Sequence, residues 1–121
     1  MKHETLTFRP GEDDQAVKAD AGKWRMTLVP PQIILDIAEV RAYGVKKYHD
    51  PENWKRVEKE RYVNALFRHL VEYEQNPWSV DEESGISHLK HAACNLAFLC
   101  YLQEQERKGL ERLERDVCDK P

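Results

Sequence analysis

The feature that most constrains this chain is an apolar run from Ala92 to Leu102, AACNLAFLCYL, in which Asn95 is the only strongly polar residue. A helix that is apolar on every side lies in a protein core or at a subunit interface. The run has eleven residues, whereas a membrane-spanning helix takes about twenty. The run therefore predicts a buried helix around which the remaining chain packs.

Two more helices are predicted before this run. After the pair Pro30-Pro31, which suits the first turn of a helix, apolar residues recur at intervals of three and four through residue 48. A similar apolar face recurs over residues 58–75, and this spacing is typical of a helix with one buried side. Helices are therefore expected over 31–48 and 58–75.

The third helix is expected to begin after Ser84 or Ser87, since either suits an N-cap. It is expected to end near residue 108, because Gly109 interrupts the pattern. The apolar positions of segment 110–117 then predict a short amphipathic C-terminal helix. No stretch alternates polar and apolar residues long enough to form a strand. The expected fold is all-α, a small bundle of three main helices plus a short C-terminal helix.

Composition divides the chain of 121 residues into three parts. Residues 1–21 are polar, with an acidic run and no clear periodicity, and are expected to form a flexible arm. Residues 22–108 hold the single helical domain, and residues 109–121 form a charged C-terminal helix or tail. The apolar run 92–102 offers more surface than two partner helices of its length can cover. A homo-oligomer, either a dimer or a tetramer, is therefore expected.

Charge and cysteine content bound the class of protein. The net charge is −3 with 34% charged residues, whereas nucleic-acid-binding domains usually carry a basic patch. The three cysteines form no CxxC pair and are interpreted as small buried hydrophobes in a reducing compartment. The first ten residues contain no apolar segment typical of a signal peptide. A cytoplasmic protein is expected, with no nucleic-acid or membrane partner.

Polar side chains gather at the start of the third predicted helix. His88, His91 and Asn95 are spaced to lie on one helix face, and Asp81 and Glu83 precede them in the loop. The positive end of the helix dipole there favours anions. Histidine and carboxylate can share a metal ion, whereas oxygen ligands alone favour Mg²⁺ or Mn²⁺. The alternative is structural: a carboxylate caps the helix, and the histidines hydrogen-bond to carboxylates of a neighbouring helix.

Other candidates lie on the two earlier helices and their loops. Asp36 and Glu39 are neighbours on a helix surface, and either a cation lies between them or water screens them. Trp54, in a polar loop, either packs as a lid or stacks on a base. Arg61 and Arg68 suit phosphate recognition because guanidinium presents a planar fork of donors, although a charged stripe of this kind is also commonly solvated.

Several short stretches occur in a characteristic order: Lys18–Lys23, Leu28–Pro30, Ala42–Tyr48, Asn53-Trp54, Arg61-Tyr62, Arg68-His69 and Asp81–Ala92. In this order they resemble a phage-borne family of dATP/dGTP diphosphohydrolases, often called MazG-like or MazZ-like. The resemblance covers about Lys18 to Leu102. It implies an all-α nucleotide pyrophosphohydrolase of the bacterial or phage-infected cytoplasm. Such an enzyme uses Mg²⁺, or Mn²⁺, to convert dATP or dGTP to the monophosphate and pyrophosphate.

The resemblance also implies roles for individual residues. The expected catalytic residues are Glu83, His88 and His91. The expected metal ligands are Asp81, Glu83, Glu72, Glu39 and Asp36. The expected contacts to the nucleotide are Lys23, Lys47, Trp54, Arg61, Arg68 and Asn95.

Two alternatives stay open because the chain lacks the complete Glu-Glu-x-x-Glu and Glu-x-x-Asp motifs that are typical of all-α pyrophosphatases. A non-catalytic phage protein that sequesters a nucleotide or cyclic nucleotide needs arginine, lysine and aromatic contacts but no carboxylate cluster. A structural helical oligomer would use the histidines as core residues. Both alternatives retain the all-α fold and the expected oligomer.

Overall fold

The structure is a computed structural model that describes residues 21–118. Contacts divide the chain into two compact units, 1–30 and 31–121. The described part of the first unit holds one 3-10 turn, η1 (Met26–Leu28). The helices of the second unit are α2 (Gln32–Tyr48), η2 (Asn53–Arg56), α3 (Lys59–Gln75) and α4 (His88–Cys118). The expected arm over residues 1–21 lies almost entirely outside the described residues.

The predicted all-α class is confirmed. In the part of the chain that the structure describes, extended pairing is limited to an isolated bridge between Val80 and Ser87. The helices α2 and α3 match their predicted ranges to within one residue at each end. None of the described helices is both long and apolar enough to span a membrane. The expected oligomer stays a prediction.

The end of α2 brings positive charge to the negative end of the helix dipole. Lys46 and Lys47 lie in its last turn, where cations are favoured. His49 then adopts a left-handed conformation with φ 63°, and its backbone N–H donates to the carbonyl of Val45 at 2.8 Å. This bond satisfies one of the carbonyls that a helix end leaves free.

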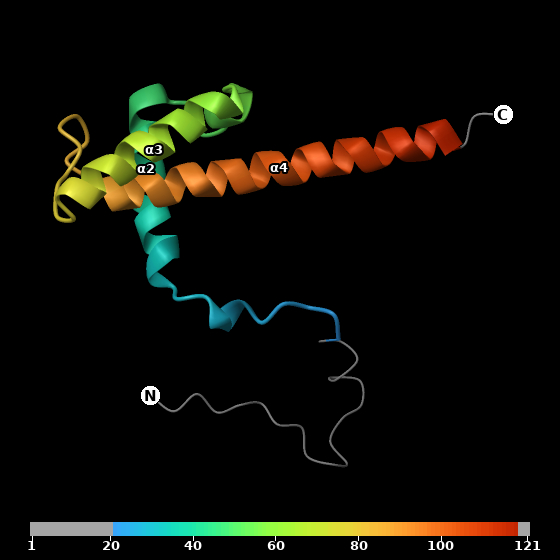
Figure 1. The fold of residues 1–121 in the computed structure, drawn as a ribbon, viewed down its shortest axis with the longest axis horizontal. Coiled ribbons are helices and arrows are strands. Elements are labelled where there is room, and N and C mark those ends of the chain that lie inside the picture. Colours follow the sequence, from blue (N-terminus) through green and yellow to red (C-terminus); the bar gives the residue numbers. More distant parts are fainter. Residues whose placement is uncertain (1–20, 119–121) are drawn as a thin grey trace, which may run out of the picture. The chain divides into compact units, whose positions relative to one another are not determined.

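The helices α3 and α4 run antiparallel and α2 packs across α4 (Figure 1). Lys59 at the start of α3 pairs with Glu106, far along α4, whereas His69 near the end of α3 meets His88 at the start of α4. Among residues 21–117, the buried apolar residues are Val40, Ala92 and Cys94, and Asn95 is buried with them. The predicted buried helix is therefore the central element, but the described residues leave part of it exposed, including Leu96 and Tyr101.

The loop before α4 is held by its own polar groups. Asp81 accepts a hydrogen bond from the backbone N–H of Ser84 at 2.9 Å, and Gly85 turns the chain with φ 71°, a conformation that glycine adopts without steric cost. The hydroxyl of Ser87 accepts from the backbone N–H of Lys90 at 3.2 Å. Ser87 is thus the N-cap, one of the two predicted residues.

The predicted helix end near Gly109 is wrong, because α4 continues through this residue to Cys118 without a break (Figure 1). A glycine inside a helix costs only about 1 kcal/mol, which strong helix formers on both sides can offset. Arg107 adds ion pairs to Glu104 and Glu111, one turn before and one turn after it. The expected short C-terminal helix is therefore the distal part of α4.

Candidate functional site

A cavity of about 500 Å³ lies among α2, η2, α3, α4 and the loop before α4. This volume falls within the range of about 300–1,000 Å³ that is common for small-molecule sites. One end is aromatic, with Trp54, Tyr62 and Phe98 in its wall. The other end is polar, and its lining includes His69, Asp81, Glu83 and His91. The cavity therefore suits a ligand with a flat ring at one end and charged groups at the other.

The aromatic end is a pre-built stack. The rings of Trp54 and Phe98 lie nearly parallel, with centroids 4.5 Å apart and an interplanar angle of 15°. Tyr62 holds η2 in place, because its hydroxyl donates a hydrogen bond to the backbone carbonyl of Trp54 at 2.6 Å. The guanidinium of Arg41 lies 5.7 Å and 5.4 Å from the two ring centroids, within range of a cation–π contact. A planar heterocycle could stack against such a surface.

Lys47 and Glu83 form an ion pair in the cavity wall. The hydrogen bond from Lys47, followed by one from Tyr43, lowers the pKa of Glu83, so the carboxylate is charged at neutral pH. This hydrogen bond, which the ammonium of Lys47 donates to Glu83, also raises the pKa of Lys47. Burial, and then the neighbouring Glu83, raise the pKa of Tyr43. A free positive charge for an anionic ligand would therefore arise at Lys47 only when its contact with Glu83 opens.

Three histidines meet at the polar end. The Nδ1 atoms of His69 and His88 are 2.8 Å apart, and the rings of His69 and His91 are stacked at 4.7 Å. Burial, together with the two neighbouring imidazoles, lowers the pKa of His69 to about 4. Burial also lowers the pKa of His91, whose Nε2 contacts the hydroxyl of Ser84 at 2.7 Å. Both imidazoles are thus neutral at pH 7 and able to accept a proton.

Asn95 connects the two ends of the cavity. Its side-chain amide donates to the carbonyl of His91 at 2.8 Å, and Asn95 is buried in the cavity lining beside Cys94. This bond fixes the amide and leaves its carbonyl oxygen as an acceptor next to the cavity. Burial raises the pKa of the Cys94 thiol to about 11, so this cysteine is inert.

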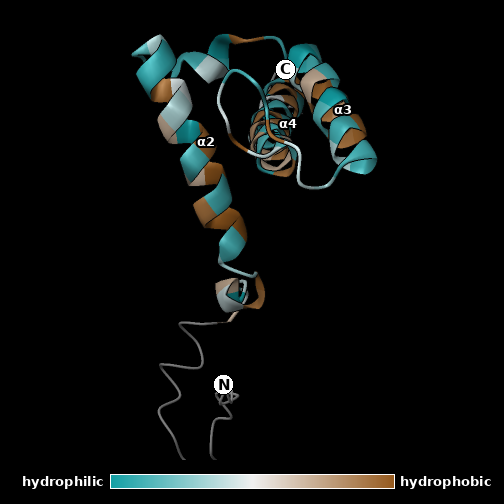
Figure 2. Ribbon diagram, turned by 90° about the vertical axis from the view of Figure 1, so that its left-hand side faces the viewer, coloured by the Kyte–Doolittle hydropathy of each residue, from teal (hydrophilic) through white to brown (hydrophobic). Residues whose placement is uncertain are grey.

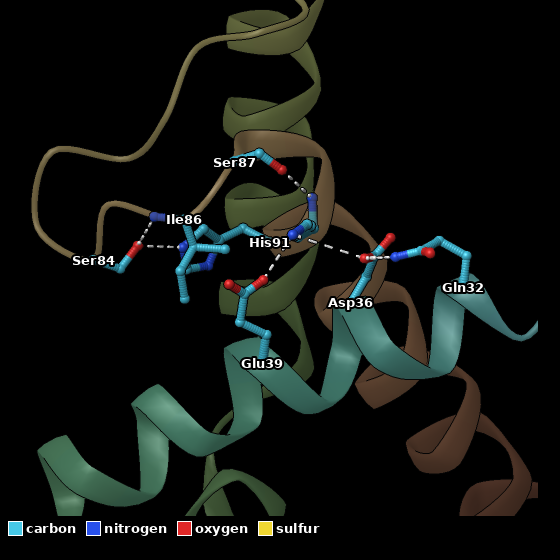
Figure 3. A network of polar contacts seen from close by, with 8 residues as sticks. Gln32, Asp36, Glu39, Ser84, Ile86, Ser87 and His91 are labelled. Carbon is cyan, nitrogen blue, oxygen red and sulfur yellow. Dashed lines mark hydrogen bonds and ion pairs between the residues drawn. The ribbon is translucent and has the colours of Figure 1, made fainter.

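The five predicted metal ligands do not converge. Asp81 and Glu83 line the cavity. Asp36 and Glu39 instead point from α2 toward the first turn of α4, near His91 (Figure 3), and both pair with Lys90. Glu72 is exposed on α3 and does not line the cavity. No group of three histidine, cysteine or carboxylate side chains is placed to hold a metal ion in residues 21–118.

The two carboxylates in the cavity nevertheless fit the binding mode that Mg²⁺ prefers with phosphate ligands. Mg²⁺ is usually held by one or two carboxylates plus oxygens of the substrate phosphates, rather than by an all-protein cage. Burial raises the pKa of Asp81, but hydrogen bonds from Ser84 outweigh this effect and leave the pKa below its ordinary value. Asp81 and Glu83 are therefore both anionic near pH 7.

The remaining predicted residues have mixed placements. The cavity is lined by Lys47, Trp54, Arg61, Asp81, Glu83, His91 and Asn95. Two others lie next to this set without lining the cavity: His88 contacts His69, and Glu39 lies near His91. Arg68 is exposed on α3 outside the cavity lining. Lys23 belongs to the first compact unit. The roles predicted for all of these residues stay predictions.

Sequence reasoning missed several residues of the cavity wall, namely Arg41, Tyr43, Tyr62, His69 and Phe98. A usable indication was the spacing on α2, because Tyr43 and Lys47 are four residues apart and share a helix face. The others could not be assigned, because their positions depend on how α3 and η2 dock against α4.

The helical fold and the cavity together define an all-α domain whose cavity suits a ligand with a flat ring and charged groups. The family described as dATP/dGTP diphosphohydrolase, N-terminal, matches residues 13–112. Since the match spans most of the sequence, the chain belongs to this family.

A curated relative gives an independent comparison. A protein of Salmonella phage PMBT28 with the name dATP/dGTP diphosphohydrolase is 36% identical over 86 residues, which is 71% of this chain. The matched region is 29% of the phage protein, so this chain spans less than a third of its relative's length. No solved structure matches the chain significantly.

Proposed function

We propose that this chain binds a purine deoxynucleoside triphosphate, dATP or dGTP, and hydrolyses it to the monophosphate and pyrophosphate. The observation that carries the proposal is a cavity whose wall includes both an aromatic stack and two carboxylates. The name of the phage relative, dATP/dGTP diphosphohydrolase, supports the choice of substrate.

The nucleotide has one orientation in this proposal. Its base stacks at the aromatic end, against Trp54, because base–aromatic stacking contributes about 1–3 kcal/mol per base. The carbonyl oxygen of Asn95 is available to accept from an amino group of the purine. The triphosphate then extends toward Lys47 and Arg61, whose cationic groups favour phosphate.

Binding of the triphosphate exchanges the partner of Lys47. In the free protein its ammonium contacts Glu83. The triphosphate carries more negative charge than the single carboxylate of Glu83, and it competes with Glu83 for the ammonium of Lys47. Once Lys47 turns to the phosphates, Glu83 loses the contact that lowers its pKa most. The carboxylate of Glu83 is then free of Lys47, so that it can accept the proton of the water that attacks phosphorus or hold the divalent cation.

A divalent cation, Mg²⁺ or Mn²⁺, is part of the proposal, with Asp81 and Glu83 as its protein ligands. When bound, such an ion offsets charge on the phosphates and lowers the pKa of water. His91, neutral at pH 7 because burial lowers its pKa, is the second proton acceptor at this end. His88 acts through His69, whose ring it contacts, and so positions the cluster.

The test is pyrophosphate release from each of the four dNTPs, with Mg²⁺ or Mn²⁺ and with a chelator. We expect turnover of dATP or dGTP that the chelator abolishes. Glu83→Gln removes a proton acceptor and should lower kcat by about 10²–10⁴-fold, the usual contribution of a general base. Glu82→Gln is the matched control, since this neighbouring carboxylate is exposed and does not line the cavity.

The second candidate function is a nucleotide-binding protein without catalysis. It is favoured by the Lys47–Glu83 and Lys90–Glu39 ion pairs, which neutralise carboxylates that a hydrolase would use. Tight binding of dATP, of dGTP or of a cyclic nucleotide, with the ligand recovered intact in the presence of Mg²⁺ or Mn²⁺, would establish this function. The same result would rule out the hydrolase.

A further inference from the structure

Gly44 lies at the centre of the face that α2 turns toward the cavity. It lines the cavity, and so do the residues three and four positions away on either side, namely Val40, Arg41, Lys47 and Tyr48. Residues at these spacings are neighbours on a helix surface. The middle of the wall that α2 contributes is therefore bare backbone, with larger side chains around it.

The packing of the described residues does not require glycine at this position. The backbone of Gly44 is helical and does not have a positive φ, so other residues can adopt it. A Cβ added here would meet Nη1 of Arg41 at 3.8 Å, an ordinary van der Waals distance, as its nearest atom outside the adjacent backbone. Glycine inside a helix is less stable than alanine. The free protein therefore gains nothing from the missing side chain.

A glycine inside a helix does not by itself indicate a site, as Gly109 of α4 shows. A Cβ added at Gly109 would also meet no close neighbour, but this residue lies outside the cavity lining. Gly44 differs because the space in front of its backbone belongs to the cavity. Glycine allows a ligand to approach the backbone closely, and this property distinguishes the two positions.

Gly44 also lies between the two ends of the cavity. Arg41, three residues before it, lies over the ring of Trp54 at the aromatic end. Lys47, three residues after it, pairs with Glu83 at the polar end. At 1.5 Å per residue, these two positions are about 9 Å apart along α2. A nucleotide that reaches both ends has one pentose between its base and its phosphates, and this pentose passes α2 at the level of Gly44.

We propose that Gly44 is a specificity-determining residue, at which the pentose of the bound nucleotide lies directly against the backbone of α2. This inference rests on the function proposed above and adds the position of the sugar. A ligand atom in van der Waals contact with Cα lies about 3.5–4.0 Å from it. Along the direction of the missing bond, an added Cβ would be only about 2.0–2.5 Å from that atom. A side chain at position 44 therefore excludes the sugar ring but leaves the free protein intact.

The substitution Gly44→Ala separates this role from a structural one, because stability and affinity should change in opposite directions. Higher helix propensity should raise the Tm of the free protein by about 2–8 °C. The added methyl group should weaken binding of a non-hydrolysable α,β-imido analogue of dATP by roughly 5- to 150-fold in Kd.

The matched control is Gly109→Ala, the same change in a helix but outside the cavity lining. It should raise the Tm and leave the Kd unchanged. Equal Kd values for the two variants would overturn the proposal. A lowered Tm for Gly44→Ala would overturn it as well, because the glycine would then serve the packing of the chain.

A change in the ligand tests the position of the sugar. In an acyclic analogue with the same base and imidotriphosphate, an open chain replaces the pentose and leaves room beside α2. Gly44→Ala should weaken binding of this analogue much less than binding of the dATP analogue, and an equal loss would overturn the proposal. Pyrophosphate release by the wild-type protein, together with an unchanged Kd for Gly44→Ala, would overturn this inference alone. Wild-type protein that binds no nucleotide would overturn both this inference and the proposed function.

Discussion

At the scale of single residues, the Lys47–Glu83 ion pair couples ligand binding to the state of a carboxylate. Both side chains are partly exposed, and ion pairs at exposed positions contribute little to stability, typically 0–1 kcal/mol. The pair therefore matters less for stability than for the charges that it places in the cavity wall. It keeps an anion and a cation in one cavity wall, and a triphosphate would attract only the cation.

The histidine cluster gives a pH-dependence of stability. His69 has a pKa of about 4 in the folded chain and 6.5 as the ordinary value, so the unfolded chain binds a proton that the folded chain does not. The free energy of unfolding should therefore fall as the pH is lowered from about 6.5 to about 4. The slope against pH corresponds to the uptake of up to one proton by His69 on unfolding. His69→Gln should reduce the slope in urea unfolding across this range.

The matched control for this slope is His49→Asn. His49 is exposed and does not line the cavity, and asparagine tolerates its left-handed backbone conformation. This variant should keep the wild-type slope. A His69→Gln variant with an unchanged slope would show that the histidine contacts do not hold the imidazole in its neutral form.

At this scale the sequence predicts which residues belong to the site better than it predicts which residues contact one another. The helical spacing places His91 and Asn95 on one face, and both line the cavity beside Asp81 and Glu83. It does not reveal that His88 meets His69, since these residues are on different helices. Nor does the helical spacing predict the ion pairs that Lys90 forms with Asp36 and Glu39, because they depend on how α2 crosses α4.

At the scale of elements, α4 shows where local sequence rules hold and where they fail. Ser87 is the N-cap, as its hydroxyl and position predict. Gly109 does not end the helix, because glycine terminates a helix readily only where the backbone turns to positive φ. Its neighbours, rich in Glu, Arg and Leu, favour continuation. A glycine is thus a weaker stop than a proline.

Replacing Gly109 tests the continuity of α4. An added Cβ at this position would meet no atom within 4 Å, so alanine brings higher helix propensity without a clash. Gly109→Ala should raise the free energy of unfolding by about 0.5–1 kcal/mol, measured by urea denaturation.

The contrasting variant is Gly85→Ala. Gly85 has φ 71° and equally open surroundings, so the only cost is that of a left-handed backbone, about 1–2 kcal/mol. A stabilised Gly85→Ala, or a destabilised Gly109→Ala, would contradict the backbone conformations described for these two positions.

At the scale of the second compact unit, the cavity exists because segments far apart in sequence converge on one side of α4. Its wall includes residues of α2, η2, α3, α4 and the loop before α4. Periodicity predicts each helix, but the docking of η2, which brings Trp54 onto Phe98, has no local sequence determinant. Within the described residues, apolar side chains on the first turns of α2 are exposed (Figure 2), and the expected oligomer stays a prediction.

The contribution of the aromatic end is measurable as ligand affinity. Trp54→Ala removes a stacking surface and should weaken binding of a non-hydrolysable α,β-imido analogue of dATP by about 1–3 kcal/mol, or roughly 5- to 150-fold in Kd. Trp54→Phe keeps an aromatic face and should retain most of the affinity. Trp78→Ala is the matched control, since this tryptophan is 90% exposed and does not line the cavity. Isothermal titration calorimetry gives the three constants, and thermal unfolding establishes that each variant is folded. Equal affinities for Trp54→Ala and Trp78→Ala would place the base elsewhere and leave the aromatic stack as a packing feature of the bundle.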